Sequence, residues 1–190
     1  EGRFLFFLRQ QGYSRAWGVD SDPGRVATAQ GLGLDARIGD CLDVIRQQAP
    51  DSLDVLICMD FLEHLDKGRA VTFLQDAYRA IKSGGGRLVV RMPCADGLMS
   101  ARDWCNDLTH KWSATSNALQ GLLRAIGFDE VWILDERPVP YHWRNSVRVM
   151  GFHFAKLVMG SLLFMLGLGA PRVWSTSMWA VGCKHTPMPG

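Results

Sequence analysis

Acidic residues stand directly after three successive apolar runs of this sequence, at Asp20, Asp40 and Asp60. Each run is predicted to be a β-strand, and in an open α/β sheet ligands bind at the carboxyl ends of the strands. A carboxylate at that edge can accept two ribose hydroxyls, and a second can accept an adenine amino group. The alternative for each acid taken alone is a helix cap.

Two histidines are candidates for proton transfer, because imidazole titrates near neutral pH. His110 lies in the polar segment 94–112, with Asp107 three residues before it as an orienting partner. The alternative for His110 is a structural loop histidine. His64 follows the run that ends at Asp60, and there a hydrogen bond to the backbone is favoured over catalysis.

Trp104 and Trp112 flank the same segment and could stack on a sugar face or cover the edge of the sheet. The five cysteines form no C-x-x-C pair, so reduced core thiols are expected and no metal site is expected.

Helical and strand patterns alternate along the first 135 residues. Helices are predicted at about 2–11, 23–31, 41–48, 67–82 and 114–126, and strands at about 16–20, 35–39, 53–59, 87–92 and 128–135. This alternation predicts an α/β fold, a doubly wound, mostly parallel sheet with helices on both faces. The near-continuous apolar run 53–59 is typical of a strand buried on both faces.

The chain of 190 residues suits a single domain, and its net charge of +2 argues against general nucleic-acid binding. Its C-terminal part differs in charge, since residues 137–190 contain six Lys/Arg and no Asp or Glu. Such a basic, apolar tail is predicted either to contact an anionic or membrane surface or to pack on the body of the protein.

Within this tail, residues 137–171 resemble an insertion with a helix of about 20 residues, followed by a final strand at about 173–182. The uninterrupted apolar run 157–169 is shorter than the roughly 20 residues that span a bilayer. An interfacial helix, peripheral membrane contact through 144–168, or a core or homodimer contact is therefore expected rather than a span.

An ordered set of motifs runs through most of the chain. It consists of Glu1-Gly2-Arg3-Phe4-Leu5, Gly18-Val19-Asp20-Ser21-Asp22-Pro23, Gly39-Asp40, Asp60-Phe61-Leu62-Glu63-His64-Leu65 and Gly84-Gly85-Gly86-Arg87-Leu88. In this order and spacing the set resembles the class I S-adenosylmethionine-dependent methyltransferases.

The resemblance implies a Rossmann-like sheet of seven strands whose last strand is antiparallel. It divides the chain into a cofactor-binding α/β domain at 1–136, the helical insertion at 137–171, and a final strand and tail at 172–190 of the same domain. The family's first strand, with most of its glycine-rich motif, is missing, so the sequence is expected to be truncated at its N-terminus.

The resemblance also implies S-adenosyl-L-methionine as the cofactor and a set of residues that bind it. Gly2 is expected under the methionine end, Asp20 at the ribose and Asp40 at the adenine. The full set is Gly2, Asp20, Ser21, Asp40, Cys41, Asp60 and Phe61, the last two on the methyl-donor side.

Residues 107–112 resemble a segment of methyltransferases from polysaccharide and lipopolysaccharide clusters. The resemblance implies O-methylation of a saccharide or other small molecule, with Asp107, Trp104 and Trp112 at the acceptor, in the cytoplasm or at the inner membrane surface.

Two other functions remain open, a nicotinamide-dependent oxidoreductase or epimerase and a non-catalytic membrane-associated scaffold. The oxidoreductase is disfavoured because the one Tyr-x-x-x-Lys pair, Tyr78 and Lys82, lies in a helix far from where that chemistry needs it.

Overall fold

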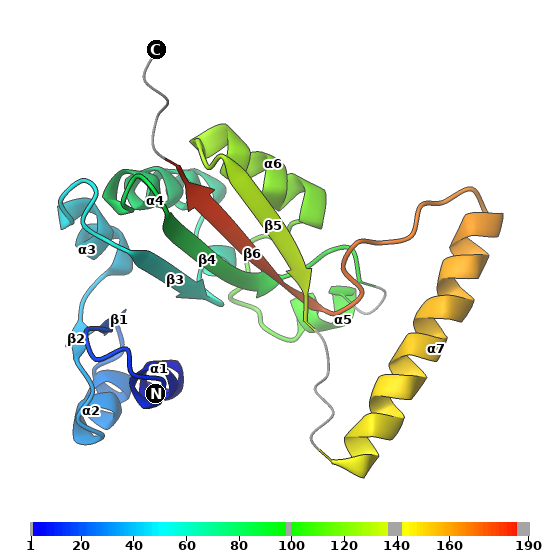
Figure 1. Cartoon of the computed structure of the whole chain (residues 1–190), viewed down its shortest axis with the longest axis horizontal. Helices are drawn as coiled ribbons and strands as arrows, with labels where there is room; N and C mark the ends of the chain where they lie inside the picture. The colour runs from blue at the N-terminus through cyan, green and yellow to red at the C-terminus, as the bar shows by residue number, and fades with distance from the viewer. Residues whose placement is uncertain (1, 98–99, 137–141, 186–190) are drawn as a thin grey trace. The chain divides into compact units, whose positions relative to one another are not determined.

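The computed structural model describes residues 2–97, 100–136 and 142–185 (Figure 1). The chain divides into two compact units, Glu1–Ala49 and Pro50–Gly190. Both are α/β units, as the alternating pattern predicts, and each is described by itself below.

The N-terminal unit is built around a pair of parallel strands, with Gly18 opposite Ala36 and Asp20 opposite Ile38. Its elements are α1 (Arg3–Gln10), β1 (Gly18–Asp20), α2 (Pro23–Gly31), β2 (Ala36–Ile38) and α3 (Cys41–Gln47). Proline at the first turn of α2 and the Asp22 side chain before it explain where that helix begins: Asp22 accepts hydrogen bonds from two backbone N–H groups.

The C-terminal unit contains a mixed sheet in the order β3-β4-β6-β5 (Figure 1). Its elements are β3 (Val55–Met59), the 3-10 helix η1 (Leu62–His64), α4 (Lys67–Ala80), β4 (Gly86–Pro93), α5 (Ser100–Cys105), α6 (Ser116–Ile126), β5 (Glu130–Asp135), α7 (Trp143–Met165) and β6 (Ser177–Lys184). β3 and β4 are parallel, whereas β6 runs antiparallel to both β4 and β5. The predicted antiparallel last strand is therefore confirmed.

The core of this unit lies where α4 and α6 cover β4 and β6. Alternate residues of β4 are buried, as a half-covered strand requires, and one face of α4 is buried with them. Fully buried side chains are Leu74, Ile81, Leu88, Val90, Met92, Leu119, Leu123, Met178 and Ala180.

The prediction that 53–59 is buried on both faces is wrong. In β3 only Cys58 is buried, while Val55 and Met59 are 49% and 37% exposed. β3 is the first strand in the order of its sheet, so its side chains are covered by fewer neighbours than those of a central strand. A second difference is α5, a helix of 6 residues inside the segment that the sequence predicts as a loop.

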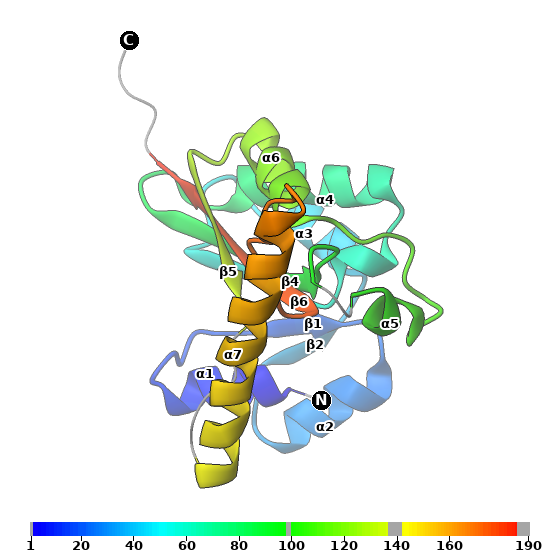
Figure 2. The ribbon, with the colours of Figure 1, turned by 90° about the vertical axis from the view of Figure 1, so that its right-hand side faces the viewer.

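The long helix α7 has 23 residues, none of which is buried. Figure 2 shows it in yellow to orange. The sequence predicts a helix of about 20 residues in this segment, and α7 begins at Trp143 and measures about 35 Å at its ordinary rise per residue. Among the described residues it is the one helix long and apolar enough to cross a membrane, with a mean hydropathy of 1.4. Length and composition alone are weak grounds for a span.

Candidate functional site

The carboxyl ends of β1 and β2 bring Asp20 and Asp40 to one edge of the N-terminal unit. The parallel register places Asp20 opposite Ile38, and the Gly39 N–H donates to the Asp20 carbonyl at 3.2 Å. Burial raises the pKa of the Cys41 thiol, and the negative charges of Asp40 and Asp20 raise it further. The three side chains therefore lie close together. Asp20 and Asp40 are two of the three acids in the acid-after-strand pattern, and the third, Asp60, belongs to the C-terminal unit.

Each of these acids also has a local role in the backbone. Oδ1 of Asp20 accepts from the Asp22 N–H at 2.9 Å, and Oδ1 of Asp40 accepts from the Leu42 N–H at 2.8 Å at the start of α3. The helix-cap alternative thus holds for Asp40, and it coexists with an exposed position at the strand edge. Ser21 is exposed beside Asp20.

The predicted cofactor residue Gly2 has a packing reason to be glycine. Its φ is +73°, and a Cβ there would lie 2.7 Å from the Cβ of Ala29 in α2 and 3.0 Å from Leu34. The close approach of the two helices would therefore select glycine without any ligand. The geometry adds this explanation to the one that the resemblance implies.

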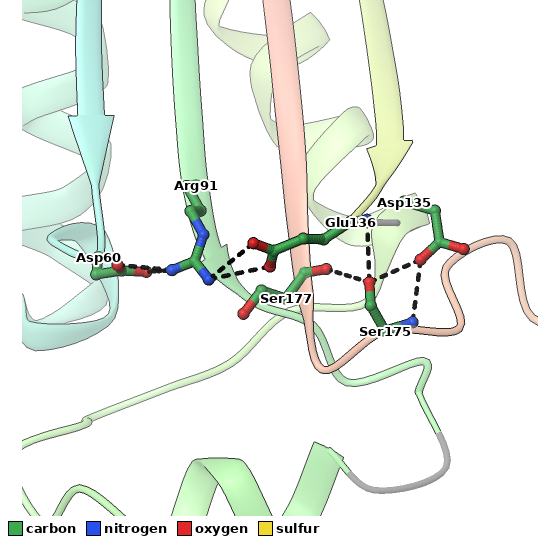
Figure 3. Close-up of polar contacts among 6 residues, drawn as sticks. All are labelled: Asp60, Arg91, Asp135, Glu136, Ser175 and Ser177. Atoms are coloured by element: carbon green, nitrogen blue, oxygen red, sulfur yellow. Dashed lines mark hydrogen bonds and ion pairs between the residues drawn. The ribbon is translucent and has the colours of Figure 1, made fainter. Parts of the chain in front are cut away.

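In the C-terminal unit, Asp60 follows β3 and is held by Arg91 of β4 (Figure 3). Both Asp60 oxygens accept from Nη1 of Arg91, at 2.6 Å for Oδ2, and Nη2 of Arg91 donates to Oε2 of Glu136 at 3.0 Å. Asp60 has a φ of +48°, which aspartate tolerates better than most residues. Arg91, a charge inside a strand, thus pairs with two acids at the carboxyl edges of β3 and β5.

A second group of polar contacts, around Asp135, lies beside the ion pairs of Arg91 with Asp60 and Glu136 (Figure 3). Oδ1 of Asp135 accepts from the hydroxyl of Ser175 at 2.6 Å, and Oδ2 accepts from Nζ of Lys156 in α7 at 2.8 Å. Burial disfavours the charged carboxylate, but the hydrogen bonds from Lys156 and Ser175 hold the pKa of Asp135 below its ordinary value. Lys156 is therefore paired within the protein, although its place in the sequence predicts a basic surface stripe.

The polar segment after α5 is fastened to the 3-10 helix η1. The Lys111 N–H donates to the Glu63 carbonyl at 2.8 Å, and the indole N–H of Trp112 donates to the Leu62 and Leu65 carbonyls, each at 3.0 Å. These contacts bring His64 and His110 together, with ring centroids 4.9 Å apart. The sequence predicts the two histidines as separate candidates, but they occupy one site.

Neighbouring groups fix which nitrogen of each imidazole carries the proton. Nδ1 of His110 lies 3.3 Å from the Trp104 carbonyl, which can only accept, so Nδ1 is the donor. The Thr109 hydroxyl donates to Asp107 at 2.6 Å and therefore accepts from Nδ1 of His64 at 2.9 Å. In the neutral imidazoles both Nε2 atoms are left with a lone pair.

Asp107 makes its hydrogen bonds to Thr109 of its own segment and none to the His110 ring. Its Oδ1 accepts from the Thr109 N–H and hydroxyl, and these hydrogen bonds lower the pKa of Asp107. Its Oδ2 lies 3.8 Å from Nε2 of His110, too far for a hydrogen bond. The predicted Asp107 and His110 side chains thus lie within ion-pair distance, and the pair is charged only when the imidazole is protonated.

The sequence reading missed Glu63, which sits between these groups. Glu63 is fully buried, its carboxylate oxygens have no hydrogen-bond partner in the described part of the chain, and burial raises the pKa of the carboxyl to about 7. The signal that would have found it is a charged residue among the apolar positions of Leu62–Leu65. Glu136, which directly follows β5, was also missed.

The aromatic candidates have mixed surroundings. The Trp104 ring lies 5.2 Å from the His110 ring and is partly exposed, as an acceptor-stacking residue requires. The indole N–H of Trp112 donates to the Leu62 and Leu65 carbonyls, as described above. Phe61 packs edge-on against Phe73 of α4, with centroids 5.1 Å apart, and is partly exposed.

Comparison with known proteins gives a family match for the N-terminal part of the chain. Residues 1–85 match the family described as a methyltransferase domain. No curated protein matches the sequence.

Three solved structures illustrate the likeness in fold. An S-adenosylmethionine-dependent methyltransferase from Archaeoglobus fulgidus is 21% identical, with 96% of this chain and 81% of that chain covered and a TM-score of 0.71. A chain from the Haloferax volcanii complex that contains a methyltransferase activator is 15% identical, with coverages of 97% and 78% and a TM-score of 0.66. A phosphoethanolamine N-methyltransferase from Haemonchus contortus, solved with S-adenosylhomocysteine, is 15% identical, with coverages of 89% and 43% and a TM-score of 0.58.

The first 85 residues therefore match a methyltransferase domain, and the chain has the Rossmann-like α/β fold of structures described as S-adenosylmethionine-dependent methyltransferases. These likenesses favour a methyltransferase over a nicotinamide-dependent oxidoreductase.

Proposed function

We propose that this protein transfers the methyl group of S-adenosylmethionine to a hydroxyl oxygen of a saccharide or another small molecule. The observation that carries the proposal is the fixed tautomer of His110, whose Nε2 lone pair is free to take a hydroxyl proton. An amine acceptor at neutral pH has less need of such a base, whereas an alcohol must lose its proton as the new bond forms.

The residues at the edge of the N-terminal unit fit the adenosyl part of the cofactor. Oδ2 of Asp20 lies 3.7 Å from Arg25 and accepts no hydrogen bond that would block a ribose hydroxyl. We assign Asp20 and Ser21 to the ribose, Asp40 and Cys41 to the adenine, and Gly2 to the methionine end. The strand that the resemblance expects before Glu1 stays a prediction, tested by comparing cofactor affinity in a chain extended upstream.

Residues of the C-terminal unit are assigned to the methyl-donor side and the acceptor. Asp60 and Phe61 fit the donor side, since one follows the end of β3 and the other is partly exposed beside it. The cofactor itself supplies an electrophilic methyl group when bound. The protein has to orient the acceptor hydroxyl, exclude water and remove its proton.

His110 is proposed to receive this proton, and Trp104 to support the acceptor. The Trp104 carbonyl that binds Nδ1 also stabilises the imidazolium after proton transfer, because its lone pairs point at the N–H. Trp104 and Trp112, with Asp107, are the residues proposed to contact the saccharide. The aromatic ring of Trp104 beside the base is what supports a sugar acceptor over a smaller alcohol.

Calorimetric titration tests the function directly. The chain is expected to bind S-adenosylhomocysteine and not NAD, because its residues 1–85 match a methyltransferase domain. Transfer of labelled methyl groups to mixed saccharides, measured beside a set of amines, then tests the acceptor. Binding of NAD alone would support the oxidoreductase, and binding of neither ligand would support a non-catalytic scaffold.

We further propose that α7 contacts an anionic membrane surface, which places the protein at the inner face of the cytoplasmic membrane. Apolar side chains of α7 are widely exposed, at 68% for Leu157 and 83% for Phe164. Arg144 and Arg148 are exposed near its N-terminal end, and no acid lies in 137–190. Exposed apolar area together with unopposed positive charge is typical of helices that bind anionic lipids.

Vesicle sedimentation provides the test of this contact. The protein is expected to sediment with vesicles of phosphatidylglycerol and phosphatidylcholine, and Leu157→Asp combined with Phe164→Asp is expected to reduce binding at least about 10-fold, since buried apolar area supplies roughly 25 cal/mol per Å². Leu108→Asp, at a residue 97% exposed outside α7, is the matched control and should bind as the wild type does. A dimer that forms through α7 and leaves vesicles unbound would contradict the proposal.

A further inference from the structure

Three side chains with metal-binding atoms converge in the C-terminal unit. Glu63 and His64 come from η1, and His110 comes from the segment that follows α5. One ligand atom of each lies within 4.8 Å of the others. Ligands with bonds of roughly 2.1 Å would need to move together by about an ångström to share one ion.

The hydrogen-bond inventory of this cluster contains acceptors without donors. Both imidazoles use Nδ1–H on an outer partner, so each presents only the Nε2 lone pair. Both carboxylate oxygens of Glu63 lack a partner among the described residues. Acceptor groups this close together repel one another unless a proton or a cation stands between them.

Burial makes this arrangement costly. Glu63 is fully buried, and a buried carboxylate without a donor costs several kcal/mol in general. Arg91, whose charge acts on Glu63, donates its Nη1 and Nη2 hydrogen bonds to Asp60 and Glu136. A bound cation would supply the charge that these contacts do not.

We propose that Glu63, His64 and His110 bind a divalent transition-metal ion such as Zn²⁺ or Mn²⁺. Two imidazole nitrogens and one carboxylate oxygen suit these ions better than Mg²⁺ or Ca²⁺, which favour oxygen ligands. The outer partners fit as well, because ligating histidines commonly donate their other N–H to a carbonyl, hydroxyl or carboxylate. Here these partners are the Trp104 carbonyl and the Thr109–Asp107 pair.

This inference goes beyond the proposed methyl transfer and does not depend on it. The ion would bind the same Nε2 lone pair of His110 that serves as the base. His110 would therefore be a ligand in the metal-loaded protein and a base in the metal-free protein. In the loaded protein a hydroxyl coordinated to the ion would be acidified instead.

Titration of the chelator-treated full chain with ZnCl₂ tests the site by calorimetry, without any activity assay. One ion per chain is expected to bind, and Co²⁺ is expected to give the visible absorption of an ion with nitrogen ligands. Glu63→Gln and His64→Ala should each weaken Zn²⁺ binding by more than about 10-fold, and Thr109→Val, which keeps all three ligands, by about 10- to 100-fold.

His185→Ala is the matched control, because His185 is an exposed histidine paired with Glu130 at 3.6 Å, outside the cluster. It should leave Zn²⁺ affinity unchanged, and circular dichroism confirms that each variant is folded. Absence of Zn²⁺ binding in the wild type overturns the proposal. Equal binding by folded Glu63→Gln overturns it too, and so does an equal loss in His185→Ala, which would indicate surface histidines.

Discussion

Asp20→Asn is expected to weaken binding of S-adenosylhomocysteine by about 10- to 100-fold. Asparagine keeps the Oδ1 atom that accepts from the Asp22 N–H at 2.9 Å, so the turn into α2 survives. It removes the negative charge and the second acceptor, which a ribose with two hydroxyls requires. Loss of a hydrogen bond to a charged group costs about 1.5–3 kcal/mol, the source of the expected change in affinity. Calorimetric titration measures it.

Asp35→Asn is the matched control in the same unit. Asp35 is an exposed acid that stands before β2, at the amino end of that strand, and pairs with Arg37 at 2.7 Å. Its replacement should leave cofactor affinity unchanged. If both variants bind alike, Asp20 is not in the cofactor site, and the edge formed by β1 and β2 loses its assigned function.

The sequence predicted the elements that carry strong local signals. Asp22-Pro23 marks the start of α2 because the side chain caps the helix and proline fits its first turn. Asp20 and Asp40 were predicted to share an edge because successive parallel strands end on the same side, and their joint effect on the pKa of Cys41 agrees.

The sequence could not predict contacts between residues far apart in the chain. His64 and His110 meet because Lys111 and Trp112 bind the backbone of η1, and no spacing encodes that. Glu63 lies in an apolar turn whose burial depends on the whole unit. For β3, an apolar run indicates a strand but does not say whether the strand stands inside a sheet or at the end of its order.

The charged residues of the tail also make contacts that the sequence could not predict. The sequence predicts that Lys156 is one of the basic residues facing an anionic surface. In the structure its Nζ donates a hydrogen bond to Asp135 at 2.8 Å. An ion pair between residues 21 positions apart is a tertiary contact that composition cannot reveal. The proposed lipid contact therefore depends on Arg144, Arg148 and the exposed apolar side chains of α7.

His110→Gln is expected to lower kcat for hydroxyl methylation by about 10²- to 10⁴-fold, the usual contribution of a general base. Glutamine keeps a polar side chain of similar length but has no basic lone pair to take the proton. The affinity for S-adenosylhomocysteine should not change, since the cofactor contacts assigned to the N-terminal unit are intact. Initial rates at saturating cofactor, measured side by side for the wild type and the variant, provide the readout.

The conditions of this measurement separate the base from the metal site. With a chelator present throughout, the wild type should keep its activity if Nε2 of His110 acts as the base. A wild type that loses activity under the chelator and recovers it with Zn²⁺ would place the role with the ion instead. Exposed His185→Gln is the control and should turn over as the wild type does, because its imidazole faces Glu130 outside the cluster. Full turnover by His110→Gln would contradict both roles, since each depends on the same lone pair.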